Sequence, residues 1–139
     1  MPTPFELRLE IPFSAPENPA VVSSRLKEAI SEAALDSGVR EIVKEGNVEP
    51  TFGQQLPTEE EVGMILAVLT FIIGELPKAW PHVEAFLEQL RARLRRTSPG
   101  TTIKADITIG KKKMHFDGFT DEDTIKVITR EYKVYFEPR

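Results

Sequence analysis

The stretch 58-TEEEVGMILAVLTFIIGEL-76 is the most apolar part of this 139-residue chain, and the rest of the sequence can be interpreted around it. Only one glycine and one threonine interrupt the apolar character of Val62–Ile73. Thr58 and Glu61 have the spacing of a capping box, in which a threonine and a glutamate three residues later satisfy free amides at a helix start. The stretch therefore predicts a helix over Thr58–Leu76 that is buried on nearly all sides.

A membrane-spanning helix needs about 20 consecutive apolar residues, which is more than this run provides. Glu59–Glu61 precede the run, and Glu75 and Lys78 follow it. We therefore expect a core helix and no membrane segment. The N-terminus, MPTPFELRLE, lacks the basic region and apolar run of a signal peptide. Because the chain also has no cysteine, the sequence predicts a cytoplasmic protein without disulfides or thiolate metal sites.

The composition is that of one globular domain. Apolar residues make up 40% of the chain and charged residues 29%, both ordinary values. The length fits a single domain over residues 1–139. The net charge of −4 argues against nucleic acid as the main partner, because a dedicated nucleic-acid binder usually carries a basic excess.

Alternating apolar and polar residues predict strands before and after the apolar stretch. The alternation is clearest near the N-terminus and directly after residue 102. The predicted strands are Phe5–Phe13, Val39–Glu45, Ile103–Ile109, a returning strand with Met114 and Phe116, and Tyr132–Phe136. Pro12 cannot donate to a neighbouring strand, so the first strand ends there or lies at an edge.

Further helices are indicated by caps and by apolar residues three and four positions apart. One begins at Pro19 behind the N-cap Asn18 and ends before Gly38. An amphipathic helix starts at Pro81, forms a hairpin with the apolar helix, and has Trp80 at the joint. A short helix with Ile125 and Ile128 follows a cap at Thr120 and Asp123, and the segment Gly46–Pro57 is expected to be a loop.

The resulting element order is β-α-β-α-α-β-β-α-β. It predicts an α/β fold of the α+β kind, a two-layer sandwich with a mixed sheet of about five strands and helices on one face. If the first two strands pair, the unit that joins them should be parallel with a right-handed crossover.

No residue pattern predicts catalysis. His82 and His115 stand alone, whereas a zinc site generally needs three or four converging ligands. Glu59–Glu61 would point in different directions from a helix. No nucleophile elbow and no phosphate-binding glycine motif is present. We therefore expect no enzymatic activity, no cofactor and no metal.

Two basic clusters are the candidate binding residues. Either could contact the phosphates of a small ligand or nucleic acid, or an acidic protein, and both are also what a helix end and a hairpin tip ordinarily carry. No aromatic residues are interleaved with them, so a stacking platform for single strands is missing. The candidates are Arg91, Arg93, Arg95 and Arg96 in one cluster, and Lys111, Lys112 and Lys113 in the other.

The order of several pieces resembles the effector-associated constant component domains of bacterial conflict and signalling systems. These pieces are Gly63-Met64 at the start of the apolar helix, the helix end Leu90–Arg96, the hairpin Ile103–Phe116, and the helix Asp121–Ile128. The resemblance implies a non-catalytic adaptor or sensor domain that pairs with a separate effector such as a protease. The alternative is a small-ligand or nucleic-acid-binding module that uses the two basic clusters. Edge strands or the amphipathic helix could also pair two copies of the chain.

Overall fold

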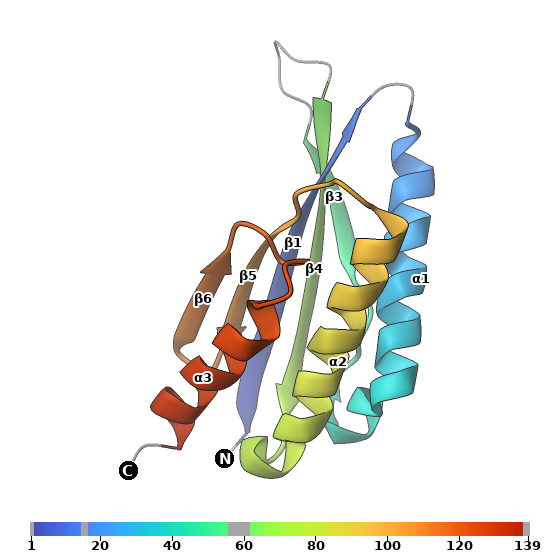
Figure 1. The fold of residues 1–139 in the computed structure, drawn as a ribbon. Helices are drawn as coiled ribbons and strands as arrows, with labels where there is room; N and C mark the ends of the chain where they lie inside the picture. The colour runs from blue at the N-terminus through green and yellow to red at the C-terminus, as the bar shows by residue number, and fades with distance from the viewer. Residues whose placement is uncertain (1, 15–16, 56–61, 138–139) are drawn as a thin grey trace.

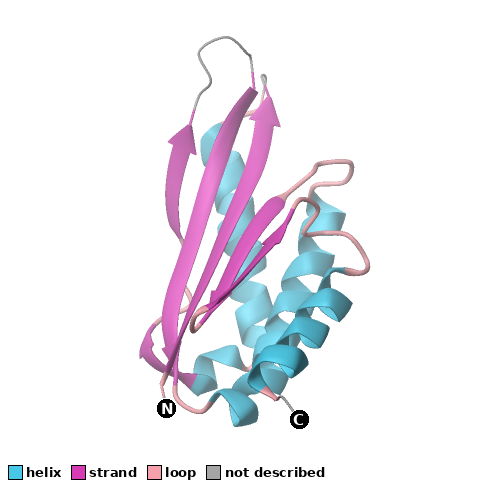
Figure 2. Cartoon of the chain, turned by 90° about the vertical axis from the view of Figure 1, so that its left-hand side faces the viewer, coloured by secondary structure: helices cyan, strands magenta, loops and turns pink. Residues whose placement is uncertain are grey.

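A computed structural model describes residues 2–14, 17–55 and 62–137 of the chain. In this part of the chain, six strands form one antiparallel sheet, and all three α-helices lie on one of its faces (Figures 1 and 2). The predicted two-layer α+β sandwich with helices on one face is thereby confirmed. The predicted mixed sheet is wrong, because every strand pairing in the described residues is antiparallel.

The element order also differs from the predicted one, because the apolar stretch is a strand and the last predicted strand is helical. The elements are β1 (Thr3–Ser14), α1 (Pro19–Ser37), a 3₁₀ turn η1 (Val39–Ile42), β2 (Val43–Gly46), β3 (Thr51–Gln55), β4 (Val62–Ile73), α2 (Leu76–Thr97), β5 (Lys104–Ile109), β6 (Lys112–Phe116) and α3 (Thr124–Phe136).

The sheet has a split β-α-β arrangement. Across the sheet the strands follow the order β4, β1, β5, β6, and β2 and β3 both pair with the other side of β4. Since β4 runs antiparallel to β1 and to β2 and β3, the latter two run parallel to β1 without touching it. If β2 and β3 are counted as one interrupted edge strand, the elements from β1 to β5 follow the β-α-β-β-α-β order of ferredoxin-like folds, and β6 and α3 extend the two layers.

The predicted helix over Thr58–Leu76 is wrong, because residues 62–73 form the central strand β4. This strand pairs with β1 along its whole length. Its alternate residues, such as Ile65 and Leu69, are buried beneath the helices, and the residues between them are also apolar. A strand that is apolar on both faces shows no period of two, and by pattern alone it cannot be distinguished from a buried helix. The proposed capping pair Thr58 and Glu61 lies outside the described residues.

Strand β1 and the hairpin of β5 and β6 agree with the sequence prediction. Most of their apolar residues face the helices and most of their polar residues face away, with Lys112 of β6 as an exception on the helical side. Pro12 lies opposite Met64 of β4, beyond the last residue of β1 that pairs with β5. The strand therefore has partners on both sides along half of its length, and the proline lies where β5 no longer pairs with it.

The segment between α1 and β4 contains more regular structure than predicted. Val39–Glu45 is a 3₁₀ turn followed by the short strand β2, and the predicted loop Gly46–Pro57 contains β3. Gly46 has a φ of +86°, and a Cβ there would lie 3.3 Å from the backbone of Phe71, so this turn requires glycine. These short strands carry few apolar residues, and both lie at the edge of the sheet, where they pair with β4.

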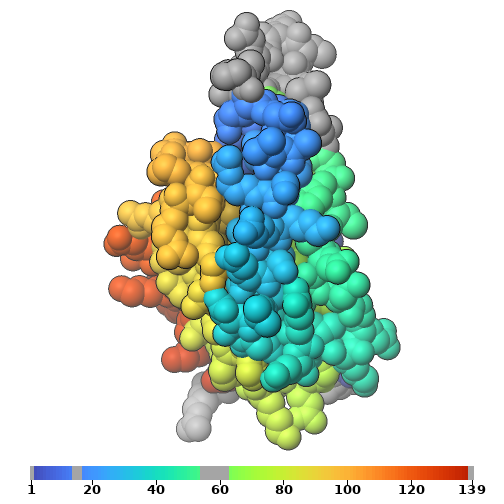
Figure 3. All heavy atoms as spheres, turned by 90° about the vertical axis from the view of Figure 1, so that its right-hand side faces the viewer, coloured from blue at the N-terminus to red at the C-terminus, as the bar shows by residue number. Residues whose placement is uncertain are grey.

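Helix α1 begins and ends as predicted. The Asn18 side chain accepts a hydrogen bond from the amide of Ala20 at 2.9 Å, and Gly38 closes the helix with a φ of +72°. Figure 3 shows α1 crossing the molecule between α2 on one side and the β2–β3 segment on the other.

Helix α2 starts earlier than predicted, at Leu76, and includes Pro81. There is no helical hairpin, since the element before α2 is a strand, and α2 packs beside α1 instead. Trp80 does not fill a joint between two consecutive helices. Its ring stacks on that of Tyr132 in α3, with centroids 3.9 Å apart and an interplanar angle of 4°.

Helix α3 runs through the segment 132–136 that was predicted to be a strand. Ile128 and Tyr132, four residues apart, are both buried against the helix layer and the sheet. In contrast, Val134 is 68% exposed, so the alternation of residues 132, 134 and 136 does not reflect a buried strand face. Tertiary contacts on one helical face decide the structure of this segment.

Candidate functional site

An open groove of about 920 Å³ is lined by residues of α2 and α3. Both helices lie on the helical side of the sheet (Figure 1). Its apolar lining comes from Pro81 and Ala85 of α2 and from Ile125 and Val134 of α3. Its polar lining consists of Glu84, Glu88, Glu122, Lys126, Thr129, Arg130 and Lys133. Apolar floor and charged rim together are typical of a surface that accepts an amphipathic segment.

Two contacts fix the distance between the walls of this groove. The stacked rings of Trp80 and Tyr132 join the helices beneath it. Above them, the Thr129 hydroxyl of α3 donates a hydrogen bond to the Glu84 carboxylate of α2 at 2.7 Å. The groove is thus held by contacts between side chains of the two helices that line it.

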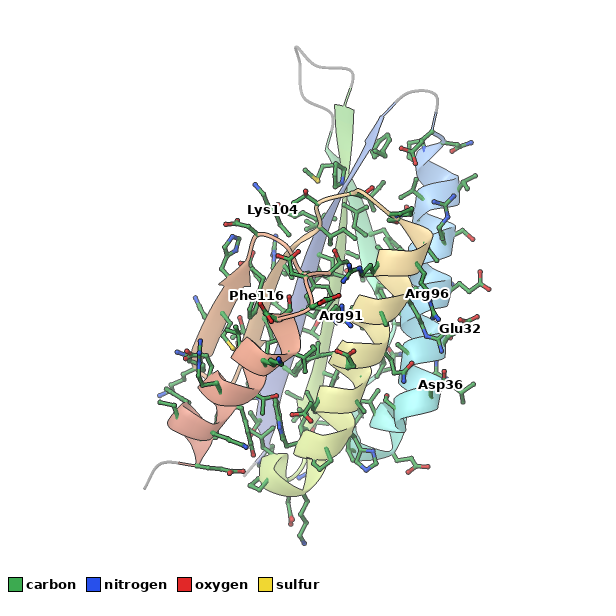
Figure 4. The ribbon with its side chains drawn as sticks, viewed as in Figure 1. Glu32, Asp36, Arg91, Arg96, Lys104 and Phe116 are labelled. Atoms are coloured by element: carbon green, nitrogen blue, oxygen red, sulfur yellow. The ribbon has the colours of Figure 1, made fainter. Side chains whose placement is uncertain are left out.

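Arg91 supports the groove at the end near the start of α3. Its guanidinium donates two hydrogen bonds to the Glu88 carboxylate, at 2.8 and 3.0 Å, and a third to the carbonyl of Thr120 at 3.1 Å (Figure 4). The hydrogen bonds from Arg91 lower the pKa of Glu88, and the same contact raises the pKa of Arg91. Only 12% of the Arg91 side chain is exposed, so this residue joins α2 to the loop before α3 and is not free to bind a ligand.

The acidic residues of the groove differ from the basic ones in their pairing. Glu88 is held by Arg91, and Glu122 pairs with Arg95 at 3.2 Å. By contrast, three exposed cations of α3 form no ion pair with any of the residues that the structure describes. These cations are Lys126, Arg130 and Lys133, which lie four and three residues apart and so on one side of the helix. Glu84, which accepts the hydrogen bond from Thr129, also has no ion pair among the described residues, so the groove presents a net positive charge.

The four arginines predicted to bind a ligand have different roles in the structure. Arg91 and Arg95 hold the two glutamates at the groove. Arg93 pairs with Glu32 at 2.6 Å and with Asp36, both on α1 (Figure 4). Arg93 thus joins α1 to α2. Arg96 is exposed and forms no ion pair within the described ranges.

The three predicted lysines lie at the opposite end of the molecule from the arginines, at and after the turn between β5 and β6 (Figure 1). Lys111 is exposed in the turn. Lys112 faces the helices and pairs with Glu131 of α3 at 3.1 Å. Lys113 points to the other face of the sheet, because neighbouring residues of a strand face opposite ways. The structure does not bring the two basic clusters together.

The sequence analysis missed the three cations of α3. Their spacing was a usable signal, since positions 126, 130 and 133 follow one helical stripe. Assigning residues 132–136 to a strand interrupted that stripe. The buried pair Ile128 and Tyr132, four residues apart, could have extended the helix through this segment.

Both histidines contact neighbouring residues of the fold. His82 lies 2.9 Å through Nδ1 from the carbonyl of Ser37 and connects the start of α2 to the end of α1. His115 lies between Asp106 at 2.6 Å and Asp117 at 2.9 Å, and hydrogen bonds to these carboxylates raise its pKa. Among the described residues, no group of three or more histidine, cysteine or acidic side chains is arranged to hold a metal ion. In the same part of the chain, no helix is long and apolar enough to span a membrane.

The pieces behind the family resemblance have mixed outcomes. The helix end Leu90–Arg96 and the hairpin Ile103–Phe116 have the expected secondary structure, and a helix begins at Thr124 within Asp121–Ile128. Gly63-Met64, expected to open a helix, lies at the start of strand β4.

Comparisons with known proteins identify no family. No protein-family model matches the chain, and no curated protein matches it. Among solved structures, the chain is similar to an amidase of the hydantoinase/carbamoylase family from Burkholderia multivorans, with 15% sequence identity and a TM-score of 0.43. The match covers 98% of this chain and 33% of the amidase chain, so the chain spans about a third of that protein's length.

Proposed function

We propose that this chain is a non-catalytic adaptor domain that binds an acidic amphipathic segment of a partner protein in the groove between α2 and α3. The observation that carries the proposal is the row of Lys126, Arg130 and Lys133 beside an apolar floor, without ion pairs to the described residues. An acidic segment would supply the missing counter-charges, and its apolar side chains would cover Ala85 and Ile125.

The apolar floor favours a protein segment over a nucleic acid. A phosphate backbone would gain from the three cations but would leave the apolar floor uncovered. An amphipathic helix can satisfy both parts of the groove, because its residues three and four apart form an apolar side next to a charged one. Besides their contribution to the affinity, the charges would set the orientation of the segment and raise the association rate.

The nature of the partner rests on the resemblance to effector-associated constant component domains. It suggests an effector such as a protease in a bacterial signalling or conflict system, with both proteins in the cytoplasm. The adaptor would then hold the effector in place and contribute no catalytic group of its own.

A charge-reversal experiment tests the groove. The variant Lys126→Glu/Arg130→Glu/Lys133→Glu is compared with Arg25→Glu/Lys27→Glu/Lys44→Glu, which changes the net charge equally at exposed sites outside the groove. A photoreactive group at Val134 captures the partner from the native source, and a labelled peptide of the cross-linked segment is titrated by fluorescence anisotropy. We expect the groove variant to weaken binding by roughly 100-fold, since three charge pairs of about 1 kcal/mol are lost.

The control variant should bind as the unchanged protein does. Equal binding by all three proteins, or loss of binding in the control alone, would contradict the proposal. A titration with single-stranded DNA at low salt separates the alternative function: binding that disappears on neutralising Lys111–Lys113 would replace the adaptor hypothesis by a nucleic-acid-binding one.

A further inference from the structure

The face of the sheet opposite the helices, here called the free face, has an apolar stripe along its central strand. The stripe consists of Met64, Leu66, Val68 and Ile72 of β4, which alternate with the buried residues of the same strand, and the exposed Thr70 interrupts it between Val68 and Ile72. All four are half-buried by their in-plane neighbours, and no helix lies over them (Figure 2). A β-sheet with apolar residues on both faces normally has a packing layer on each, and the described chain supplies only one.

On the side of β3 the stripe is bordered by small side chains, so the surface of a partner could reach it. Thr51 and Gly53 lie opposite Val68 and Leu66 in the register of β3 with β4. A Cβ placed on Gly53 would meet no atom within 4 Å. The aliphatic side chains of β4 are therefore bordered by small residues and open space, which makes them accessible to a flat partner surface.

On the other side of the stripe, the charges of the free face offset one another. Arg8 of β1 lies opposite Asp106 of β5, and Glu10 lies opposite Lys104. His115 of β6 contacts Asp106 and the carboxylate of Asp117. The remaining charges on this face are Glu6 and Lys113, of opposite sign, and Glu45 of β2, which lies opposite Ile72. The free face thus carries charges of both signs and a small net negative charge, unlike the groove on the helical side.

We propose that the free face binds the free face of a second copy of this chain, so that the apolar stripes of two β4 strands pack against each other. A face with charges of both signs and a small net charge can approach its own copy without strong repulsion, whereas it offers little to attract a strongly charged partner. The area is also sufficient. The six strands contain 44 residues, and at about 3.4 Å per residue and about 4.8 Å between strands they give a face on the order of 700 Å². A standard stable interface buries about 800 Å² on each partner.

The dimer would have two sheets in its centre and the helices on its outer sides. Packed sheets lie about 10 Å apart with strand directions at about −30°, which lets the two stripes cross near Val68. The contact is isologous, with the same residues on both copies, and it closes without leaving a free face. Both grooves between α2 and α3 would remain accessible, so this inference does not depend on the proposed adaptor function.

Sedimentation equilibrium of the unmodified full-length chain tests the proposal. We expect a species of twice the 15.7 kDa chain mass at micromolar concentration. Leu66→Lys places a charge in the stripe and should raise the dissociation constant by roughly 100-fold, the range of an interface hot spot. The matched control is Leu35→Lys on α1, where the leucine is 70% exposed and outside the free face. This control should remain dimeric.

A second measurement covers the case in which Leu66→Lys fails to fold. Because the chain has no cysteine, a single Val68→Cys change allows cross-linking of two copies through one defined site with a short bis-maleimide. We expect a cross-linked dimer for Val68→Cys and none for Leu35→Cys. A monomeric unmodified protein, a folded Leu66→Lys variant that remains fully dimeric, or cross-linking at position 35 but not at 68 would each overturn the proposal.

Discussion

The two faces of strand β4 have nearly the same composition but very different surroundings. Toward the helices, Ile65, Leu69 and Ile73 are 2% exposed or less. Toward the free face, Leu66 and Val68 are equally apolar but remain partly open to solvent. An apolar residue in a strand thus predicts that another layer packs over it. The residue does not indicate whether this layer belongs to the same chain or to another one. The predictions below compare the two faces.

The largest difference is expected between two leucines of the same strand. Leu69→Ala removes a fully buried side chain and should reduce the free energy of unfolding by about 2–5 kcal/mol. Leu66→Ala, on the free face, should cost much less in dilute solution, because the side chain already contacts water. Urea unfolding over a range of protein concentrations measures both. A loss of similar size for both variants in dilute solution would show that the free face is covered by the same chain.

Enlarging a side chain should separate the two faces as well. Ala67→Leu inserts extra methylene and methyl groups into the packed layer between sheet and helices and should destabilise the protein by about 1–3 kcal/mol. Val68→Leu adds one methylene on the free face and should leave the unfolding of the monomer almost unchanged. Thermal unfolding followed by circular dichroism compares them. Equal destabilisation by both changes would contradict the assignment of the two faces.

The smallest effect concerns His115 on the free face and depends on pH. Its pKa in the folded protein is raised from 6.5 by the hydrogen bonds to Asp106 and Asp117. The stabilisation is thus fully present below pH 6.5 and is lost as the pH rises through the folded-state pKa. His115→Gln should therefore lower the melting temperature below pH 6.5 and have little effect in alkaline buffer.

The control for this prediction is Lys113→Gln, two residues away on the same face of β6 and without ion pairs in the described chain. It should change the melting temperature by a similar small amount at both pH values. A pH-independent effect of His115→Gln would mean that the carboxylates do not stabilise the charged imidazole.

Local signals account for the elements that the sequence predicted correctly. Strands β1, β5 and β6 are buried on one face only, so the alternation of apolar and polar residues is visible. Helix α1 is delimited by the side chain of Asn18 and the backbone conformation of Gly38, both of which affect only the nearest residues. Strand β4 and the C-terminal half of α3 were wrong for opposite reasons. In β4 the alternation is absent because both faces are apolar, and in α3 a chance alternation competed with the helical spacing of Ile128 and Tyr132.

The candidate groove could be predicted only in part. The sequence marked Arg91 and Arg95 as part of a basic cluster, but Glu88, three residues before Arg91 on α2, pairs with Arg91, and Glu122 pairs with Arg95 from the other side of the groove. The unpaired cations belong to α3, and their common side is defined only if that segment is helical. Whether a charge is free or paired depends on neighbours from other elements, which a linear pattern does not contain.

The sequence by itself determined the class of the fold, the ends of α1, the β5–β6 hairpin and the apolar character of residues 62–73. Tertiary structure decided that these residues form a strand, because pairing with β1, β2 and β3 satisfies their backbone hydrogen bonds on both sides. It also decided which of their faces meets the helices. Alternate residues of one strand differ in burial only through the layers packed against them, and those layers come from segments far away in the chain.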